Sequence, residues 1–115
     1  MDAIHKGEII MLRVEQSKLL QSIFNEFRIS IIDQLLLGDK NIADIERKLK
    51  IPRNKICYHL NILENAKILE SKYVILQEAH SKGRAGRVYS INQDRLAEAK
   101  KAIDDFRDKV NKLGS

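Results

Sequence analysis

The sequence contains a single cysteine, Cys57, so no disulfide can form within the chain. It also lacks any apolar run close to the roughly 20 residues that a membrane-spanning helix needs. Its first residues do not show the basic stretch followed by an apolar stretch that is typical of a secretion signal. These absences favour a location in the cytoplasm. The cytoplasm is a reducing environment, in which a disulfide between two chains through Cys57 would be unusual.

Combinations of residues that carry catalysis are missing as well. The chain has no Ser/His/Asp or Cys/His arrangement, no phosphate-binding glycine loop and no carboxylate pair in a credible cleft. A metal site needs several imidazole or thiolate ligands gathered together, whereas His5, His59, His80 and Cys57 are scattered along the chain. We therefore expect neither enzymatic activity nor a metal or other cofactor.

What the sequence does contain is an uneven distribution of positive charge. The chain of 115 residues is 43% hydrophobic and 32% charged, a balance typical of one small globular domain, and its net charge is +5. Residues 46–87 hold ten basic and four acidic side chains, whereas residues 1–45 hold five basic and seven acidic ones. A basic middle region is the charge pattern of a protein that binds a phosphate backbone, although a solvated lysine-rich surface gives the same pattern.

The segment from residue 24 to residue 67 contains three predicted helices. The first covers residues 24–37, and Gly38 follows at a position suited to a helix C-terminal cap, before a turn at Asp39 and Lys40. Asn41 is placed to cap the second helix, which runs to about Leu49. Pro52 suits the first turn of the third helix, which runs to about Lys67. The side chains predicted to face inward are Phe24, Phe27, Ile31, Ile32, Leu35, Leu36, Ile42, Ile45, Leu49, Ile56, Leu60 and Leu63.

Two runs of β-forming residues follow, at 72–79 and 87–92, separated by a basic turn that contains Gly83 and Gly86. Two helices joined by a tight turn and followed by a β-hairpin are the outline of a winged helix-turn-helix. The sequence therefore predicts a mainly α fold with a small β-hairpin wing. The candidate contacts to the DNA backbone, from the wing and from the basic residues around the helix turn, are Lys48, Lys50, Lys82, Arg84 and Arg87.

The third helix, which we call the recognition helix, carries polar side chains opposite its apolar face. A helix that enters the major groove must present hydrogen-bonding groups near its N-terminus. For His59, packing at the seam between helices is as compatible with the sequence as a DNA contact. The candidate base-contacting residues are Arg53, Asn54, Lys55, Tyr58, His59 and Asn61.

Both ends of the chain are predicted to be helical. Residues 1–22 favour a helix, although a short strand within residues 8–14 is compatible with the same residues. In the last segment, capped by Asn92, apolar residues alternate at spacings of three and four, the heptad pattern of a helix that pairs with a second copy or packs on its own domain. We expect residues 1–91 to form the DNA-binding part and residues 92–115 a dimerisation helix of the same compact domain. The predicted dimer contacts are Leu96, Ala99, Ile103, Phe106, Val110 and Leu113.

From about residue 24 to residue 91 the chain resembles the arsenical-resistance-repressor (ArsR) type of winged-helix transcription regulator. The resemblance rests on Arg28 in the first supporting helix, on residues 56–60 followed by Leu63, and on the strand that contains Tyr89. The family usually has serine where Cys57 stands and glycine where Lys67 stands. Its metal sensors carry a Cys-x-Cys pair before the recognition helix, or His and Asp ligands on the last helix, and neither set is complete here.

The resemblance implies a dimeric protein that binds double-stranded DNA and represses transcription, with the recognition helix in the major groove and the hairpin on the backbone. Such compact regulators are frequent in archaea and their viruses, and the lysine- and isoleucine-rich composition is compatible with that source. Two other functions fit the same residues: an abundant architectural protein that coats DNA with little sequence preference, and a winged-helix module that binds other proteins.

Overall fold

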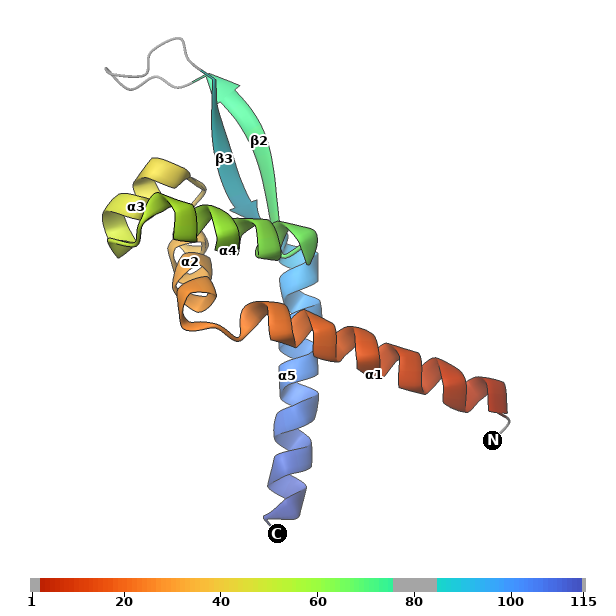
Figure 1. Ribbon diagram of the computed structural model, residues 1–115. Helices are drawn as coiled ribbons and strands as arrows, with labels where there is room; N and C mark the ends of the chain where they lie inside the picture. Colours follow the sequence, from red (N-terminus) through yellow and green to blue (C-terminus); the bar gives the residue numbers. More distant parts are fainter. Residues whose placement is uncertain (1–2, 76–84, 115) are drawn as a thin grey trace.

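The structure, a computed structural model, describes residues 3–75 and 85–114, with side chains described from residue 13 onward. Within these ranges the chain forms five helices and three short strands (Figure 1). In chain order they are α1 (Ala3–Ile23), α2 (Glu26–Leu36), β1 (Lys40–Asn41), α3 (Ile42–Leu49), α4 (Arg53–Asn65), β2 (Leu69–Ile75), β3 (Ala85–Ile91) and α5 (Gln93–Leu113).

Asparagine side chains fix where three of the helices begin. The Asn25 side chain accepts hydrogen bonds from the backbone N–H groups of residues 27 and 28, and so starts α2. The Asn41 side chain accepts from the backbone of Asp44 at the start of α3, and Asn92 accepts from the backbone of Arg95 at the start of α5. Each contact satisfies an N–H group that has no partner within its helix. The caps predicted at Asn41 and Asn92 are confirmed.

The three strands form one antiparallel sheet in the order β1-β3-β2. β2 and β3 pair from Leu69 opposite Ile91 to Ile75 opposite Ala85, and β1 adds two residues on the other edge of β3. The hairpin formed by β2 and β3 rises from the C-terminal end of α4 and extends beyond the helices (Figure 1). This arrangement, with α3 and α4 beside the hairpin, is a winged helix-turn-helix, as predicted.

The core lies where α2, α3 and α4 meet the base of the hairpin. Its fully buried side chains are aliphatic and come from these helices and from the residues just after α4. Burying a side chain of this size stabilises the fold by roughly 1.5–3 kcal/mol. The largest of them are Ile31, Ile45, Ile56, Leu60, Leu63, Ile68 and Leu69.

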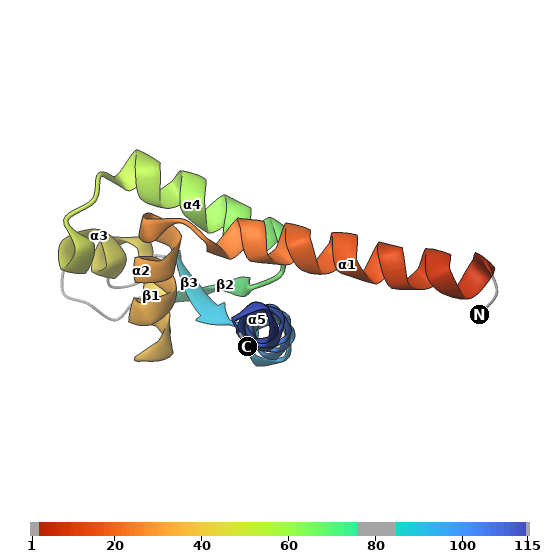
Figure 2. The same ribbon diagram turned by 90° about the horizontal axis from the view of Figure 1, so that it is seen from below.

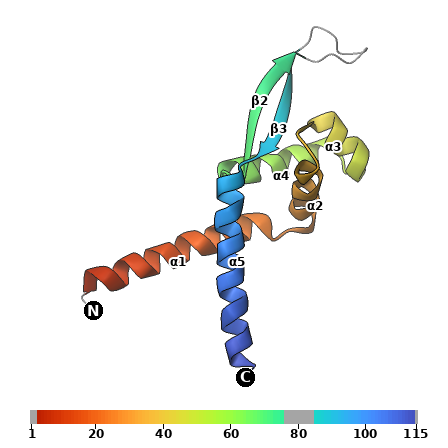
Figure 3. The same ribbon diagram turned by 180° about the vertical axis from the view of Figure 1, so that it is seen from behind.

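The two long terminal helices extend away from this core. α1 and α5 cross near the domain, and the N-terminal part of α1 and the C-terminal part of α5 project in different directions (Figure 3). The radius of gyration is 17.8 Å, against about 13 Å for a compact domain of this length. None of the helices formed by the described residues is long and apolar enough to cross a membrane.

Some predicted features differ in the structure. Phe24 and Leu36 were expected inside, but they are 59% and 56% exposed, because Phe24 lies in the break between α1 and α2 and Leu36 on the solvent side of the last turn of α2. Lys40 was assigned to a turn and instead begins β1. β2 begins at Leu69 and β3 at Ala85, earlier than predicted, while residues 76–84 lie outside the described part. The prediction of a helix for residues 1–22, rather than a short strand within residues 8–14, is confirmed by α1.

Candidate nucleic-acid interface

The turn between α3 and α4 sets the angle between the two helices. Lys50 ends α3 in the left-handed conformation, with a φ of 55°, and its N–H donates to the Glu46 carbonyl oxygen at 2.8 Å. Pro52 occupies the N-cap position of α4, where its missing N–H group costs no hydrogen bond. The backbone N–H of Ile56 donates to the Pro52 carbonyl oxygen at 3.1 Å, closing the first turn of α4. The first residues of α4, which follow this turn, are exposed to solvent.

The outer face of α4 carries most of the side chains that were predicted to contact bases. In Figure 2, α4 lies along one edge of the molecule and α5 toward the opposite edge. The apolar side chains of α4 point into the core, so the polar ones are left on the outside in the first three turns. The exposed side chains on this face are Arg53, Asn54, Lys55, Tyr58 and Asn61.

His59, by contrast, is buried: its side chain is 6% exposed and lies beneath the polar face. Its Nδ1 atom lies 3.1 Å from the Nη1 atom of Arg28, and since arginine can only donate, Nδ1 accepts and the proton is on Nε2. Phe27 stacks on the imidazole with ring centroids 5.4 Å apart, and Tyr58 approaches it edge-on at 5.0 Å. The expected base contact from His59 is therefore wrong for this conformation, and its packing alternative describes the structure.

The same cluster lies between α4 and α2 and favours the neutral form of His59. Burial lowers the pKa of His59, and the positive charges of Arg28 and Lys55 lower it further. The Lys55 ammonium lies 5.1 Å from the centre of the Phe27 ring, an arrangement that attracts a cation to the ring face. Lys55 and Tyr58 are therefore exposed on the outer face and also contact the aromatic cluster beneath them.

Arg87 lies in β3 and connects the hairpin to the recognition helix. Its Nη2 atom donates to both carboxylate oxygens of Glu64, at 2.7 and 2.9 Å, and its Nε atom donates to the Ser71 hydroxyl at 2.8 Å. The Ser71 hydroxyl in turn donates to Glu64 at 2.7 Å, and the guanidinium lies 5.2 Å from the centre of the Tyr89 ring. Arg87 was expected to contact a phosphate, but its Nε and Nη2 donors make hydrogen bonds within the chain.

The other predicted backbone contacts divide into two groups. Lys48, on α3, and Lys50, in the helix turn, are exposed close to the start of α4. Lys82 and Arg84 lie outside the described residues. Arg53 pairs loosely with Glu46 at 3.8 Å, and since both side chains are largely exposed this contact leaves Arg53 available to a ligand.

The predicted dimer contacts also divide into two groups along α5. Ala99 is 1% exposed and Leu96 is half-buried, because the first turns of α5 pack against the core of their own chain. The assignment of Ala99 to an interface between two copies is therefore wrong. Farther along the helix, Phe106 is 64% exposed and Leu113 is 86% exposed, and the exposed apolar residues of this part are Ile103, Phe106, Val110 and Leu113.

Comparison with family models finds a match over the centre of the chain. Residues 25–71 match the family described as bacterial regulatory protein, arsR family. The match covers less than half of the chain and includes the helix-turn-helix. It begins at the cap of α2, contains α3 and α4, and ends within β2. No curated protein matches the sequence.

Solved structures share the arrangement of the elements over most of the chain. The crystal structure of a possible transcriptional regulator for arsenical resistance is 18% identical and has a TM-score of 0.67, with 84% of this chain and 92% of that chain covered. An ArsR-like transcriptional regulator from Rhodococcus sp. RHA1 is 21% identical, with a TM-score of 0.65 and coverage of 87% and 86%. A transcriptional regulator homologue from Pyrococcus horikoshii OT3 is 20% identical, with a TM-score of 0.61 and coverage of 86% and 96%. At these identities the likeness establishes the fold.

The contacts that support the helix-turn-helix from beneath could not be predicted from the sequence, although Phe27 was expected inside and Arg28 was one of the residues that carry the resemblance. Glu64 and Ser71 connect α4 to the hairpin, and Phe27 and Arg28 hold His59. One signal was available, because Glu64 is the one acidic residue within α4. For metal binding, the described residues contain no group of three or more His, Cys, Asp or Glu side chains that could hold an ion.

Proposed function

We propose that the protein is a dimeric transcription regulator that binds double-stranded DNA at specific sequences and represses transcription. The observation that carries the proposal is the exposed polar face at the start of α4, within the segment that matches the arsR family. Arginine and lysine can pair with guanine edges or phosphates, and asparagine can pair with adenine. The concentration of positive charge in residues 46–87 supports binding to a phosphate backbone.

Within this proposal, the residues of α4 have different tasks from those around it. Arg53, Asn54 and Tyr58 are proposed to read bases, since they are exposed on the outer face of α4. Lys48 and Lys50 are proposed to contact phosphates, and so are Lys82 and Arg84, which are assigned from the sequence. His59 and Arg87 are proposed to position these groups, since Nδ1 of His59 and the Nε and Nη2 atoms of Arg87 already make hydrogen bonds within the chain.

The proposed dimer is formed by the C-terminal half of α5. Phe106, Val110 and Leu113 follow one stripe of this helix, are exposed, and lie beyond the part that packs on the core. A stripe of this kind is stabilised when a second copy covers it. A symmetric dimer would present two copies of α4 to successive major-groove turns, about 34 Å apart. A repressor acts by occupying such a site, where it obstructs transcription.

The first test is selection of bound duplexes from a random pool of about 30 base pairs, a length that admits two half-sites one helical turn apart. The proposal predicts recovery of an inverted repeat. Salt-sensitive binding without an enriched sequence would favour an architectural role, and absence of binding at low salt would leave a protein-interaction module. Transcription from a promoter that contains the selected site should fall when the protein is added.

Two matched variants separate base reading from phosphate binding. Asn54→Ala should change the preferred base at one position of each half-site, at a cost of about 1–3 kcal/mol for the original sequence. Lys48→Ala should weaken binding to all sequences alike and reduce the dependence of log Kd on log salt by about one. Uniform weakening by both variants would contradict this division of tasks.

A further inference from the structure

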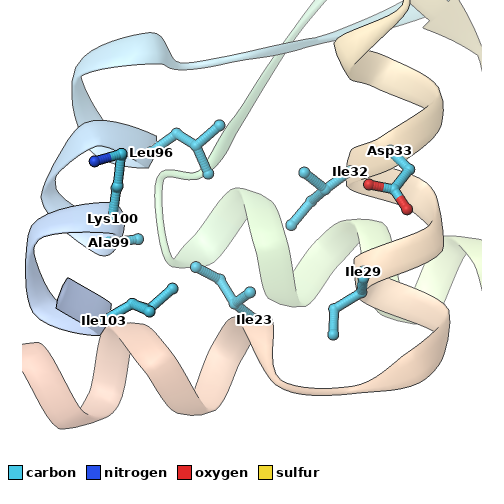
Figure 4. Close-up of a pocket in the computed structure, with 8 residues that line it drawn as sticks. All are labelled: Ile23, Ile29, Ile32, Asp33, Leu96, Ala99, Lys100 and Ile103. Carbon is cyan, nitrogen blue, oxygen red and sulfur yellow. The ribbon is translucent and has the colours of Figure 1, made fainter. Parts of the chain in front are cut away.

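An apolar groove lies between α2 and α5, away from the polar face of α4. It has a volume of about 190 Å³, and its walls are formed by Ile29 and Ile32 of α2 and by Leu96 and Ile103 of α5, with Ile23 at the end of α1 (Figure 4). Two of these side chains lie at the open side, where Ile29 is 42% and Ile103 is 38% exposed. A ligand that covers them would remove apolar surface from water.

The size of the groove selects a small molecule over a protein segment. The groove spans the residues from Leu96 to Ile103, which correspond to about 10 Å along a helix axis. An α-helix with its side chains is itself about 10–12 Å wide, too large for this volume. Apolar cavities of about 150 Å³ hold a single aromatic ring. The groove therefore has space for a ring and a short chain.

The charges at the groove determine which end group such a molecule should carry. The Lys100 ammonium is directed away from the groove (Figure 4) and donates to Asp104 at 2.9 Å. Asp33 stands on the α2 wall, and among the described residues it has no hydrogen-bond or ion-pair partner. The groove thus presents an unpaired carboxylate beside an apolar surface, while the nearby positive charge is already engaged.

We propose that this groove binds a lipophilic cation, an amine with one ring or a comparable apolar body, whose ammonium group pairs with Asp33. The apolar body lies on Ile29, Ile32 and Ile103, and the ammonium faces the carboxylate. Ile103 lines the groove and is also one of the exposed apolar residues of α5, whereas Phe106, Val110 and Leu113, which form the proposed dimer contact, do not line it. The proposal concerns a binding site and does not depend on the proposed DNA function.

The test uses three probes with the same apolar body: phenylpropylamine, phenylpropanol and phenylpropionate. The full chain, labelled at isoleucine methyl groups, is titrated with each probe and followed by NMR. The amine should shift the methyl signals of Ile29 and Ile103 with a dissociation constant on the order of 1 mM, as is usual for a molecule of about ten heavy atoms. It should bind about two- to fivefold more tightly than the alcohol, because a largely exposed ion pair contributes little. The carboxylate should bind most weakly.

Two substitutions of one kind assign the preference to Asp33. Asp33→Asn should reduce the affinity for the amine to that for the alcohol, which should itself be unchanged. Asp39→Asn makes the same change at an exposed carboxylate that does not line the groove, and it should leave all three affinities as they are. Ile29→Gln, at an exposed wall position, should weaken the amine and the alcohol alike.

Three results would overturn the proposal. One is an absence of methyl shifts at Ile29 and Ile103 with all three probes. Another is equal affinity of the wild-type protein for the amine and the alcohol, or a preference for the amine that survives in Asp33→Asn. The third is a set of interchain contacts at these methyl groups in the ligand-free protein, which would identify a second copy of the chain as the occupant of the groove.

Discussion

Lys67 adopts a backbone conformation that glycine tolerates better than lysine. It follows the cap of α4 with a φ of 64°, while the N–H of Ile68 donates to the Leu63 carbonyl oxygen at 2.9 Å, closing the helix end. The left-handed conformation costs an L-residue roughly 1–2 kcal/mol, and the greater freedom of glycine in the unfolded chain offsets part of the gain. Lys67→Gly should therefore raise the free energy of unfolding by about 0.5–1 kcal/mol, as measured by urea denaturation.

The preceding residue provides the control for this effect. Ala66 has a φ of −79° in the ordinary right-handed region, so glycine brings no relief there. Ala66→Gly should lower the free energy of unfolding by about 0.5–1 kcal/mol. If the two substitutions shift stability in the same direction, the backbone conformation of Lys67 does not limit stability.

His59 should make the stability of the protein depend on pH. Burial, with the charges of Arg28 and Lys55, lowers the pKa of His59 in the folded state below the ordinary value of 6.5. Between these two values the unfolded state binds the additional proton, so the free energy of unfolding decreases as the pH falls. The contribution is complete above about pH 6.5 and is lost as the pH falls toward the pKa of the folded state. Urea denaturation between about pH 7.5 and 5 measures this loss.

The comparison that isolates His59 is the variant His59→Asn. The asparagine side-chain oxygen can accept the hydrogen bond from Arg28, as Nδ1 of His59 does, but it does not titrate. The variant should lose less stability than the wild-type protein over the same pH interval, since the other histidines and the carboxylates are common to both. Parallel curves for the two proteins would show that His59 does not carry the effect.

At the scale of elements, one ion pair connects the end of the recognition helix to the hairpin. Arg87 and Glu64 make two hydrogen bonds, and Ser71 bridges them. Their side chains are 36% and 22% exposed, so solvent screens part of the interaction, and we expect a coupling of about 1 kcal/mol. A double-mutant cycle of Glu64→Gln and Arg87→Gln, read out by urea denaturation, measures this coupling.

A surface pair within one helix provides the reference for that cycle. Lys100 and Asp104 lie four residues apart on α5 at 2.9 Å, and the lysine side chain is 79% exposed. Pairs of this kind contribute about 0.3–0.5 kcal/mol. If the coupling between Glu64 and Arg87 does not exceed the coupling of this pair, their ion pair does not contribute more than a surface pair to holding the hairpin on α4.

The elements that the sequence predicted well are those specified by neighbouring residues. The helices follow apolar spacings of three and four, and the caps at Asn41 and Asn92 lie next to the turns that they complete. β1 was missed because its two residues carry no pattern of their own and become a strand through pairing with Val88 and Tyr89. Short strands of this kind depend on tertiary contacts.

In the candidate site, too, the features set by neighbouring residues could be predicted, and those set by residues distant in the sequence could not. The exposed face of α4 could be predicted because it lies opposite the apolar residues of one helix. The position of His59 could not, since Arg28, its hydrogen-bond partner, lies 31 residues earlier in the chain. Arg87 was given a phosphate contact because it is basic and borders the predicted hairpin turn, and its partner Glu64 could not be foreseen because it lies 23 residues away and on another element.

At the scale of the whole molecule, the basic surface and the free end of α5 lie in different regions. The positive charge is concentrated in residues 46–87, and the hairpin and α4 stand at one end of the molecule while α5 projects from the other (Figure 3). The principal extents are 62 × 31 × 22 Å. Pairing through the free end of α5 would leave both copies of α4 uncovered, as binding to two half-sites requires.

The exposed stripe of α5 gives a direct test of the proposed dimer. Phe106 is 64% exposed and lies one turn before Val110, and large aromatic side chains often dominate the binding energy of an interface. Phe106→Lys should cost about 2 kcal/mol or more of association free energy, a roughly thirtyfold rise in the dimer dissociation constant. Asn111→Lys adds the same charge on another face of α5 and should leave the constant nearly unchanged. Sedimentation equilibrium measures both variants, and equal effects would contradict pairing through this stripe.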